Sequence, residues 1–146
     1  MKQAARVSVV LTAILAVVVI LVLWKRNDRA QAIAALETRF GADLSINGGE
    51  FYLGCSSPEL VDLVEFAGLA KRVGNPTILD LTGAPALRSL AGVERLDSLV
   101  SLVAIDCPAL VSTEGLSGHP ALGEIVFTDS AGLSDVSAIR GLSKLK

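Results

Sequence analysis

The residues that could act as nucleophiles, bases or metal ligands are few and widely separated. The 146-residue chain has two cysteines, Cys55 and Cys107, and one histidine, His119. A Cys–His pair needs an exposed, activated thiolate, and a zinc site needs several Cys or His ligands at short spacing. We expect neither: Cys107 is predicted to be a small buried residue, and His119 to lie at a partly exposed turn.

Carboxylates and glycines offer two further kinds of site. Asp106 and Asp129 lie 23 positions apart, and paired acids can act in hydrolysis or bind calcium. Gly92 and Gly115 have the same separation, and the glycines match no phosphate-binding pattern. Solvated positions and turns of a repeating unit are the simpler interpretation of both pairs. We therefore predict a protein that is not an enzyme and binds no metal or cofactor.

The 23-residue spacing extends over residues 79–146, in copies at 79–101, 102–124 and 125–146. Alternating apolar positions at the start of each copy predict a short strand with one inward face. Leu79, Leu102 and Ile125 should therefore lie side by side on neighbouring parallel strands. The other aligned columns are Leu81/Ala104/Phe127, Ala84/Cys107/Ser130, Leu87/Leu110/Leu133, Leu90/Thr113/Val136, Val93/Leu116/Ile139 and Leu99/Leu122/Leu145.

The segment from Leu96 to Leu110 reads L-x-x-L-x-x-L-x-A-x-x-C-P-x-L, which resembles the leucine-rich repeat family of bacterial, N-terminally anchored type. The resemblance covers residues 51–146, with 51–78 as an atypical first repeat. It implies an α/β solenoid, that is, a short leucine-rich repeat array with parallel strands, acting as a non-catalytic protein–protein interaction module. A disulfide between Cys55 and Cys107 would have to cross two coils and is not expected.

The N-terminal region, residues 1–27, is predicted to be a transmembrane anchor. The run from Val7 to Trp24 contains only two polar residues, Ser8 and Thr12. At about 27 Å long it approaches the roughly 30 Å hydrocarbon core of a bilayer. A cleaved signal peptide is the alternative, although its apolar region is ordinarily shorter. We expect a signal anchor and a single-pass membrane protein, with the repeats outside the cytoplasm.

Residues 28–50 are predicted to form a helical and hairpin cap between the anchor and the repeats. A helix should run from Asp28 to Phe40, either as a lid over the first repeat or as a continuation of the membrane helix. Residues 44–53 read as a hairpin that turns at residues 47–49. A second helix is predicted to start near Pro58 and to end before Gly74.

The balance of charge excludes one class of partner. Residues 42–146 carry thirteen Asp or Glu against seven Lys or Arg, and nucleic acid requires a basic face. An unidentified protein is the expected partner, bound on the concave strand face. The alternative is that the outward apolar residues Val103, Ile105 and Val126 are present only because β-branched residues favour strands. The predicted contact residues are Asp80, Thr82, Val103, Ile105, Asp106, Val126, Thr128 and Asp129.

The C-terminal copy exposes apolar positions that a further repeat would cover, among them Ile125, Phe127 and Ile139. Two alternatives follow from this uncapped coil. The chain is either a structural envelope protein that self-associates through that end, or a truncated fragment of a longer repeat protein.

Overall fold

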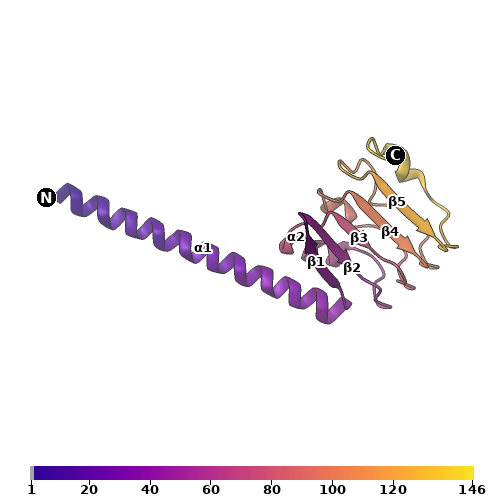
Figure 1. Cartoon of the computed structure of the whole chain (residues 1–146), viewed down its shortest axis with the longest axis horizontal. Coiled ribbons are helices and arrows are strands. Elements are labelled where there is room, and N and C mark those ends of the chain that lie inside the picture. Colours follow the sequence, from indigo (N-terminus) through magenta and orange to yellow (C-terminus); the bar gives the residue numbers. More distant parts are fainter. Residues whose placement is uncertain (1) are drawn as a thin grey trace.

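The computed structural model describes the backbone of residues 2–146 and the side chains of residues 14–146. Within these residues the chain forms two α-helices and one five-stranded sheet (Figure 1). The helices are α1 (Lys2–Phe40) and α2 (Val64–Val73), with short 3₁₀ helices at Val93–Arg95 and Ser137–Gly141. The strands are β1 (Asp43–Asn47), β2 (Glu50–Gly54), β3 (Ile78–Asp80), β4 (Ser101–Ile105) and β5 (Glu124–Thr128).

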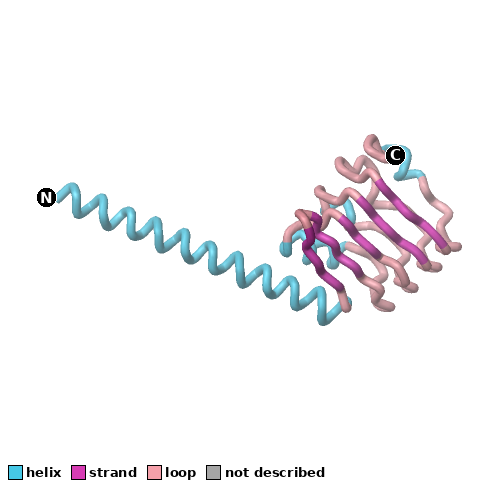
Figure 2. The backbone as a smooth tube through the Cα atoms, in the orientation of Figure 1, coloured by secondary structure: helices cyan, strands magenta, loops and turns pink. Residues whose placement is uncertain are grey.

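The strands lie in the sheet in the order of the sequence, β1-β2-β3-β4-β5 (Figure 2). β1 and β2 form an antiparallel hairpin, and the remaining pairs are parallel. Leu79 pairs with Leu102 and Leu102 with Ile125, so these residues lie side by side on neighbouring parallel strands, as the 23-residue spacing predicts.

The register between β2 and β3 differs from the sequence alignment. Aligning Phe51 with Leu79 implies an offset of 28, but Leu53 is the residue that pairs with Leu79. Leu53 is fully buried, while the Phe51 amide donates a hydrogen bond to Thr77 Oγ1 at 2.9 Å. The inward apolar side chains set the register of a sheet with one buried face, and the longer connection through α2 absorbs the change in spacing.

A single, mainly aliphatic core lies between the sheet and a layer formed by α2 and the return segments, which contribute buried leucines such as Leu87, Leu96 and Leu110. The inner side chains of β2, β3 and β4 are fully buried at Leu53, Leu79 and Leu102. The helix α2 contributes its buried face of Phe66, Ala67, Ala70 and Val73. This helix begins at Val64 rather than near Pro58, so the predicted start is wrong. The Asp62 carboxylate accepts a hydrogen bond from the Val64 amide at 2.9 Å, an acceptor that suits the free amides of a helix start.

The last turns of α1 pack against α2, so the segment after Asp28 both continues the helix that begins at Lys2 and covers α2. Leu36 is fully buried, and the rings of Phe40 and Phe66 meet edge to face with centroids 5.4 Å apart. Arg39 pairs with Glu65 on the surface of this contact. Before Asp28 the described side chains of α1 are exposed, and the helix projects away from the sheet (Figure 1).

Among the residues that the structure describes, no helix combines the length and apolar character needed to cross a membrane. Residues 7–13 of the predicted span lie outside the residues whose side chains are described. The predictions of a transmembrane helix, a signal anchor and a single-pass membrane location with extracytoplasmic repeats are therefore wrong.

The predicted fold class is also wrong. The prediction combines an α/β solenoid of leucine-rich repeats and a hairpin cap with a transmembrane helix, whereas the described residues form one five-stranded mixed sheet and two helices, neither of them membrane-spanning. In the described residues the architecture is a mixed, mostly parallel sheet with one long helix docked at its β1–β2 end through α2. Among the strands, the 23-residue spacing determines the register of β3, β4 and β5, and the parallel bridges Ser89–Ser112 and Ser112–Asp135 in the return segments have the same spacing.

The ion pair between Asp28 of α1 and Arg72 of α2 makes this contact sensitive to pH. Arg72 Nε donates to Asp28 Oδ1 at 3.1 Å, and this hydrogen bond is the main reason that the pKa of Asp28 lies below its ordinary 3.8. A carboxyl whose pKa is lower in the folded state stabilises that state above its unfolded pKa. That contribution is lost as the pH falls from 3.8 through the lower folded-state pKa.

We therefore expect the Arg72→Met variant to return the pKa of Asp28 towards 3.8, as followed by ¹³C NMR titration of its carboxyl. Lys71 is the matched control, because it lies on the same helix and pairs with Asp97. The Lys71→Met variant should leave the Asp28 titration unchanged. Identical titrations of Asp28 in the wild type and in Arg72→Met would contradict this assignment of the ion pair.

Candidate binding surface on the open face of the sheet

The face of the sheet opposite the core, here called the open face, carries the outward side chains of β1 to β5. Side chains alternate along a strand, and on β3 and β4 every outward residue stays partly exposed while its inward neighbours are buried. The open face comprises Asp43, Ser45, Asn47, Glu50, Tyr52, Gly54, Ile78, Asp80, Ser101, Val103, Ile105, Glu124, Val126 and Thr128.

The structure brings most of the predicted contact residues together in two rows across the strands. Asp80, Val103 and Val126 pair with one another in the first row. Ile105 pairs with Thr128 in the second. Thr82 lies beside Ile105, because the amides of the residues before and after Thr82 donate to the carbonyls of Val103 and Ile105, both at 2.8 Å.

Asp106 and Asp129 have a conformational role at the ends of β4 and β5. Both residues have a φ of 54°, and Gly83 occupies the same position after β3 with a φ of 76°. Asp is among the few residues other than glycine that adopt this left-handed conformation readily. The two carboxylates are exposed, so they border the open face and also form the turns that end its strands.

A small hollow of about 160 Å³ lies at the β1–β2 end of the open face, lined by Asp43, Tyr52, Gly54, Cys55 and Asp80 among others. Tyr52 Oη donates to Asp80 Oδ2 at 3.1 Å, and the Thr82 amide donates to Asp80 Oδ1 at 2.9 Å. A Cβ on Gly54 would lie 2.8 Å from Tyr52 Oη. The glycine therefore leaves the space into which the tyrosine reaches.

The electrostatic environment of this hollow is negative. The pKa of Tyr52 is raised, first by partial burial and then by the hydrogen bond to Asp80 and the charges of Asp80 and Asp43. Sequence reasoning missed Tyr52 and Asp43 because the hairpin lies outside the 23-residue spacing. The signal that could have found them is the alternation along β1 and β2, which puts both residues on the outward face.

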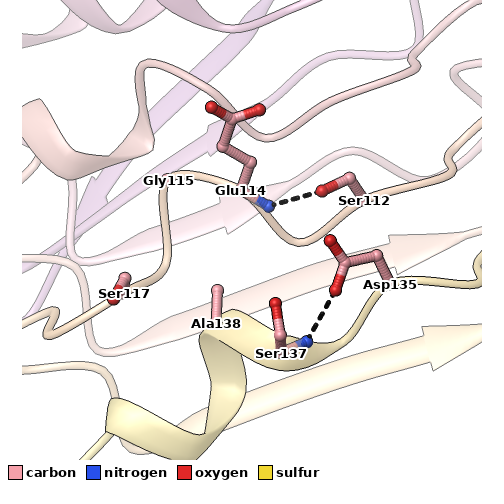
Figure 3. Close-up of a pocket in the computed structure, with 7 residues that line it drawn as sticks. All are labelled: Ser112, Glu114, Gly115, Ser117, Asp135, Ser137 and Ala138. Carbon is pink, nitrogen blue, oxygen red and sulfur yellow. Dashed lines mark hydrogen bonds between the residues drawn. The ribbon is translucent and has the colours of Figure 1, made fainter.

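A larger hollow, about 290 Å³, lies among the return segments between strands (Figure 3). The Glu114 amide donates to Ser112 Oγ at 3.1 Å and the Ser137 amide to Asp135 Oδ1 at 3.0 Å. The bonds from Ser137 lower the pKa of Asp135. These are local turns in which a side chain accepts from the amide two residues later, and Ser89 and Asp62 form the same turn. The Ser112 hydroxyl and the Asp135 carboxylate, which line this hollow, are therefore engaged in turns of the fold.

Cys107 and His119 are both buried, which argues against nucleophilic chemistry. Cys107 Sγ donates to the Leu81 carbonyl at 3.1 Å, and burial raises the pKa of its thiol. His119 is 3 % exposed, with Nε2 3.0 Å from the Leu96 carbonyl oxygen and Nδ1 buried without a partner. The prediction of a partly exposed turn for His119 is wrong, because its aligned neighbours Leu96 and Leu142 point into the core.

Cys55, the other cysteine, is also buried, and both thiols are free. Across the described residues, no group of three or more His, Cys, Asp or Glu side chains is arranged to hold a metal ion. No family model, curated protein or solved structure matches the chain, so the resemblance to leucine-rich repeats rests on the aligned sequence columns alone.

Proposed function

We propose that this chain is a non-catalytic protein-binding module whose ligand lies on the open face of the sheet. The observation that carries the proposal is a patch of three aliphatic side chains, Val103, Ile105 and Val126. They are only partly buried on the adjacent strands β4 and β5. Apolar groups that neighbour one another at an uncovered surface commonly mark a contact surface.

The shape of the surface favours a protein over a small molecule. Small-molecule sites are concave, with volumes of roughly 300–1,000 Å³, whereas the hollow beside Tyr52 measures about 160 Å³. A hollow of about 680 Å³ touches the open face only at Glu124, and its other lining residues lie outside the strands. The remainder of the face is a sheet whose outward side chains form continuous rows. A broad surface of this kind supports binding through many shallow contacts, as protein interfaces do.

Replacing both Val103 and Ile105 by glutamine should weaken partner binding by about tenfold or more, because a polar amide in place of an aliphatic contact at the centre of an interface costs about 1–2 kcal/mol. Partners would be captured by photo-crosslinking from residue 126 in native extracts, and their affinities then measured with purified components. Both changes lie at outward positions, so thermal unfolding should follow that of the wild type.

Val111 provides the matched control, since it is 46 % exposed and lies on a return segment outside the open face. The Val111→Gln variant should bind the captured partner as the wild type does. Undiminished binding by the double variant would reject the open face as the binding surface, and so would an equal loss in the Val111 variant.

A further inference from the structure

Charge is distributed unevenly between the open face and the rest of the molecule. Within the part of the chain that the structure describes, the five strands contain four carboxylates, Asp43, Glu50, Asp80 and Glu124, and no Lys, Arg or His. Each of the four points outward by the register of the sheet. The turn residues Asp106 and Asp129 add two more exposed carboxylates at the ends of β4 and β5.

The cations lie elsewhere in the described chain. Arg39 and Arg72 pair with carboxylates across the α1–α2 contact, and Lys71 pairs with Asp97. Lys144 and Lys146 approach the sheet only beyond its β5 edge, where they line a hollow with Glu124. The open face between β1 and β4 therefore presents an uncompensated negative surface, which attracts a cationic partner and disfavours an acidic one.

The hollow at Tyr52 offers a defined position for one cation. Asp80 accepts from Tyr52 Oη and from the Thr82 amide, which leaves acceptor capacity on a carboxylate that has about four lone-pair sites. Asp43 lines the same hollow. A guanidinium or ammonium group can bind both carboxylates and lie against the tyrosine ring.

The hollow and the aliphatic patch belong to one continuous row. Asp43, Gly54, Asp80, Val103 and Val126 pair in succession across all five strands, at about 4.8 Å per strand. Val126 thus lies about 14 Å from Gly54, which lines the hollow. Same-face side chains of an extended peptide recur about every 6.7 Å, so positions i and i+4 of a peptide match the hollow and Val126.

We propose that the ligand of the open face is an extended protein segment bearing a Lys or Arg side chain, with aliphatic side chains two and four residues away from it. The cation binds between Asp43 and Asp80, and the aliphatic side chain at i+4 packs on Val126. The side chain at i+2, about 6.7 Å along the peptide, lies between Asp80 and Val103, at about 4.8 and 9.6 Å, and packs on Val103 from that side. This inference rests on the proposed function, because it names the class of partner for the same surface.

The test is a selection of random twelve-residue peptides, displayed on phage, against the full chain. Clones that also bind the Val103→Gln/Ile105→Gln variant are discarded. The remaining peptides should be enriched in Lys or Arg with aliphatic residues at the stated spacing. Synthetic versions should lose about tenfold in affinity when the cation is replaced by glutamine, and should bind more weakly as NaCl is raised, because salt screens exposed charges.

The chain itself supplies the matched variants. Asp43→Asn/Asp80→Asn keeps the side-chain shape and should weaken these peptides about tenfold, whereas Glu114→Gln, on the far return segment, should leave their affinity unchanged. Peptides that depend on Val103 and Ile105 but carry no cation, or that bind the asparagine variant equally well, would overturn this inference and leave the proposed function intact. A selection that yields no peptide dependent on Val103 and Ile105 would overturn both.

Discussion

Replacing Leu102 by alanine should lower the free energy of unfolding by about 2–5 kcal/mol, the range for removing a large aliphatic side chain from a packed core. Leu102 is fully buried on β4, and it pairs with Leu79 on one side and Ile125 on the other. A domain of this size has a total stability of about 5–15 kcal/mol. The variant should therefore unfold at a much lower urea concentration, as followed by far-UV circular dichroism.

Ile125 is the control within the same row of the sheet. Its side chain has the same number of carbon atoms as that of Leu102, so truncation to alanine removes equally many. Ile125, however, lies on the edge strand β5 and is only partly buried. The Ile125→Ala variant should lower the free energy of unfolding by only about 1–2 kcal/mol, because the Ile125 side chain buries less apolar surface on folding than that of Leu102. Equal losses for Leu102→Ala and Ile125→Ala would contradict the assignment of the core to the inner side of β2 to β4.

Replacing Gly92 by alanine should cost about 3 kcal/mol or more, since two separate penalties add at this position. Gly92 has a φ of 107°, which side-chain-bearing residues rarely adopt. Its Cβ would also lie 2.4 Å from the Leu63 carbonyl carbon and 2.5 Å from the Val64 nitrogen. Both atoms are backbone at the start of α2, so the clash can be relieved only by moving the helix.

Gly118 allows the conformational penalty to be measured without the steric one. It has a φ of 66°, but nothing lies within 4 Å of the Cβ that would be added there. The Gly118→Ala variant should therefore pay only the conformational cost, about 1–2 kcal/mol. Thermal unfolding of the two variants measures the difference, and equal midpoints would show that Gly92 is not needed for the close approach of α2.

The sheet between β3 and β5 could be predicted because its spacing is constant. A fixed 23-residue period places Leu79, Leu102 and Ile125 at equivalent inward positions, and alternation then determines the outward residues. The register of β2 could not be predicted in this way. The insertion of α2 changes the distance along the chain from 23 to 26 residues, and sequence spacing gives no indication of how much chain a helix and its turns consume.

The candidate site shows the same division. Val103, Ile105 and Val126 were predicted from alternation, but Tyr52 and Asp43 were missed because they meet Asp80 only through the hairpin register. The buried position of His119 was missed for another reason. His119 aligns with Leu96 and Leu142, and a polar residue among leucines suggests that this position is exposed. Its burial follows instead from its position in the 23-residue spacing, which it shares with these two buried leucines. The continuity of α1 was only one of two alternatives for the segment after Asp28, because a change in composition there does not by itself show whether a helix ends.

The length of α1 has a mechanical consequence. Its 39 residues form a rod about 58 Å long at a rise of about 1.5 Å per residue, held at one end by the contact with α2. The helix is fixed to α2 by the ion pair between Asp28 and Arg72 and by the contact between the rings of Phe40 and Phe66, so any change in its direction pivots at this contact. A rotation of about 5° at this point displaces Lys2, about 39 Å from Asp28 along the helix, by about 3 Å. A few side chains on α2 thus control the direction in which the whole helix extends from the sheet.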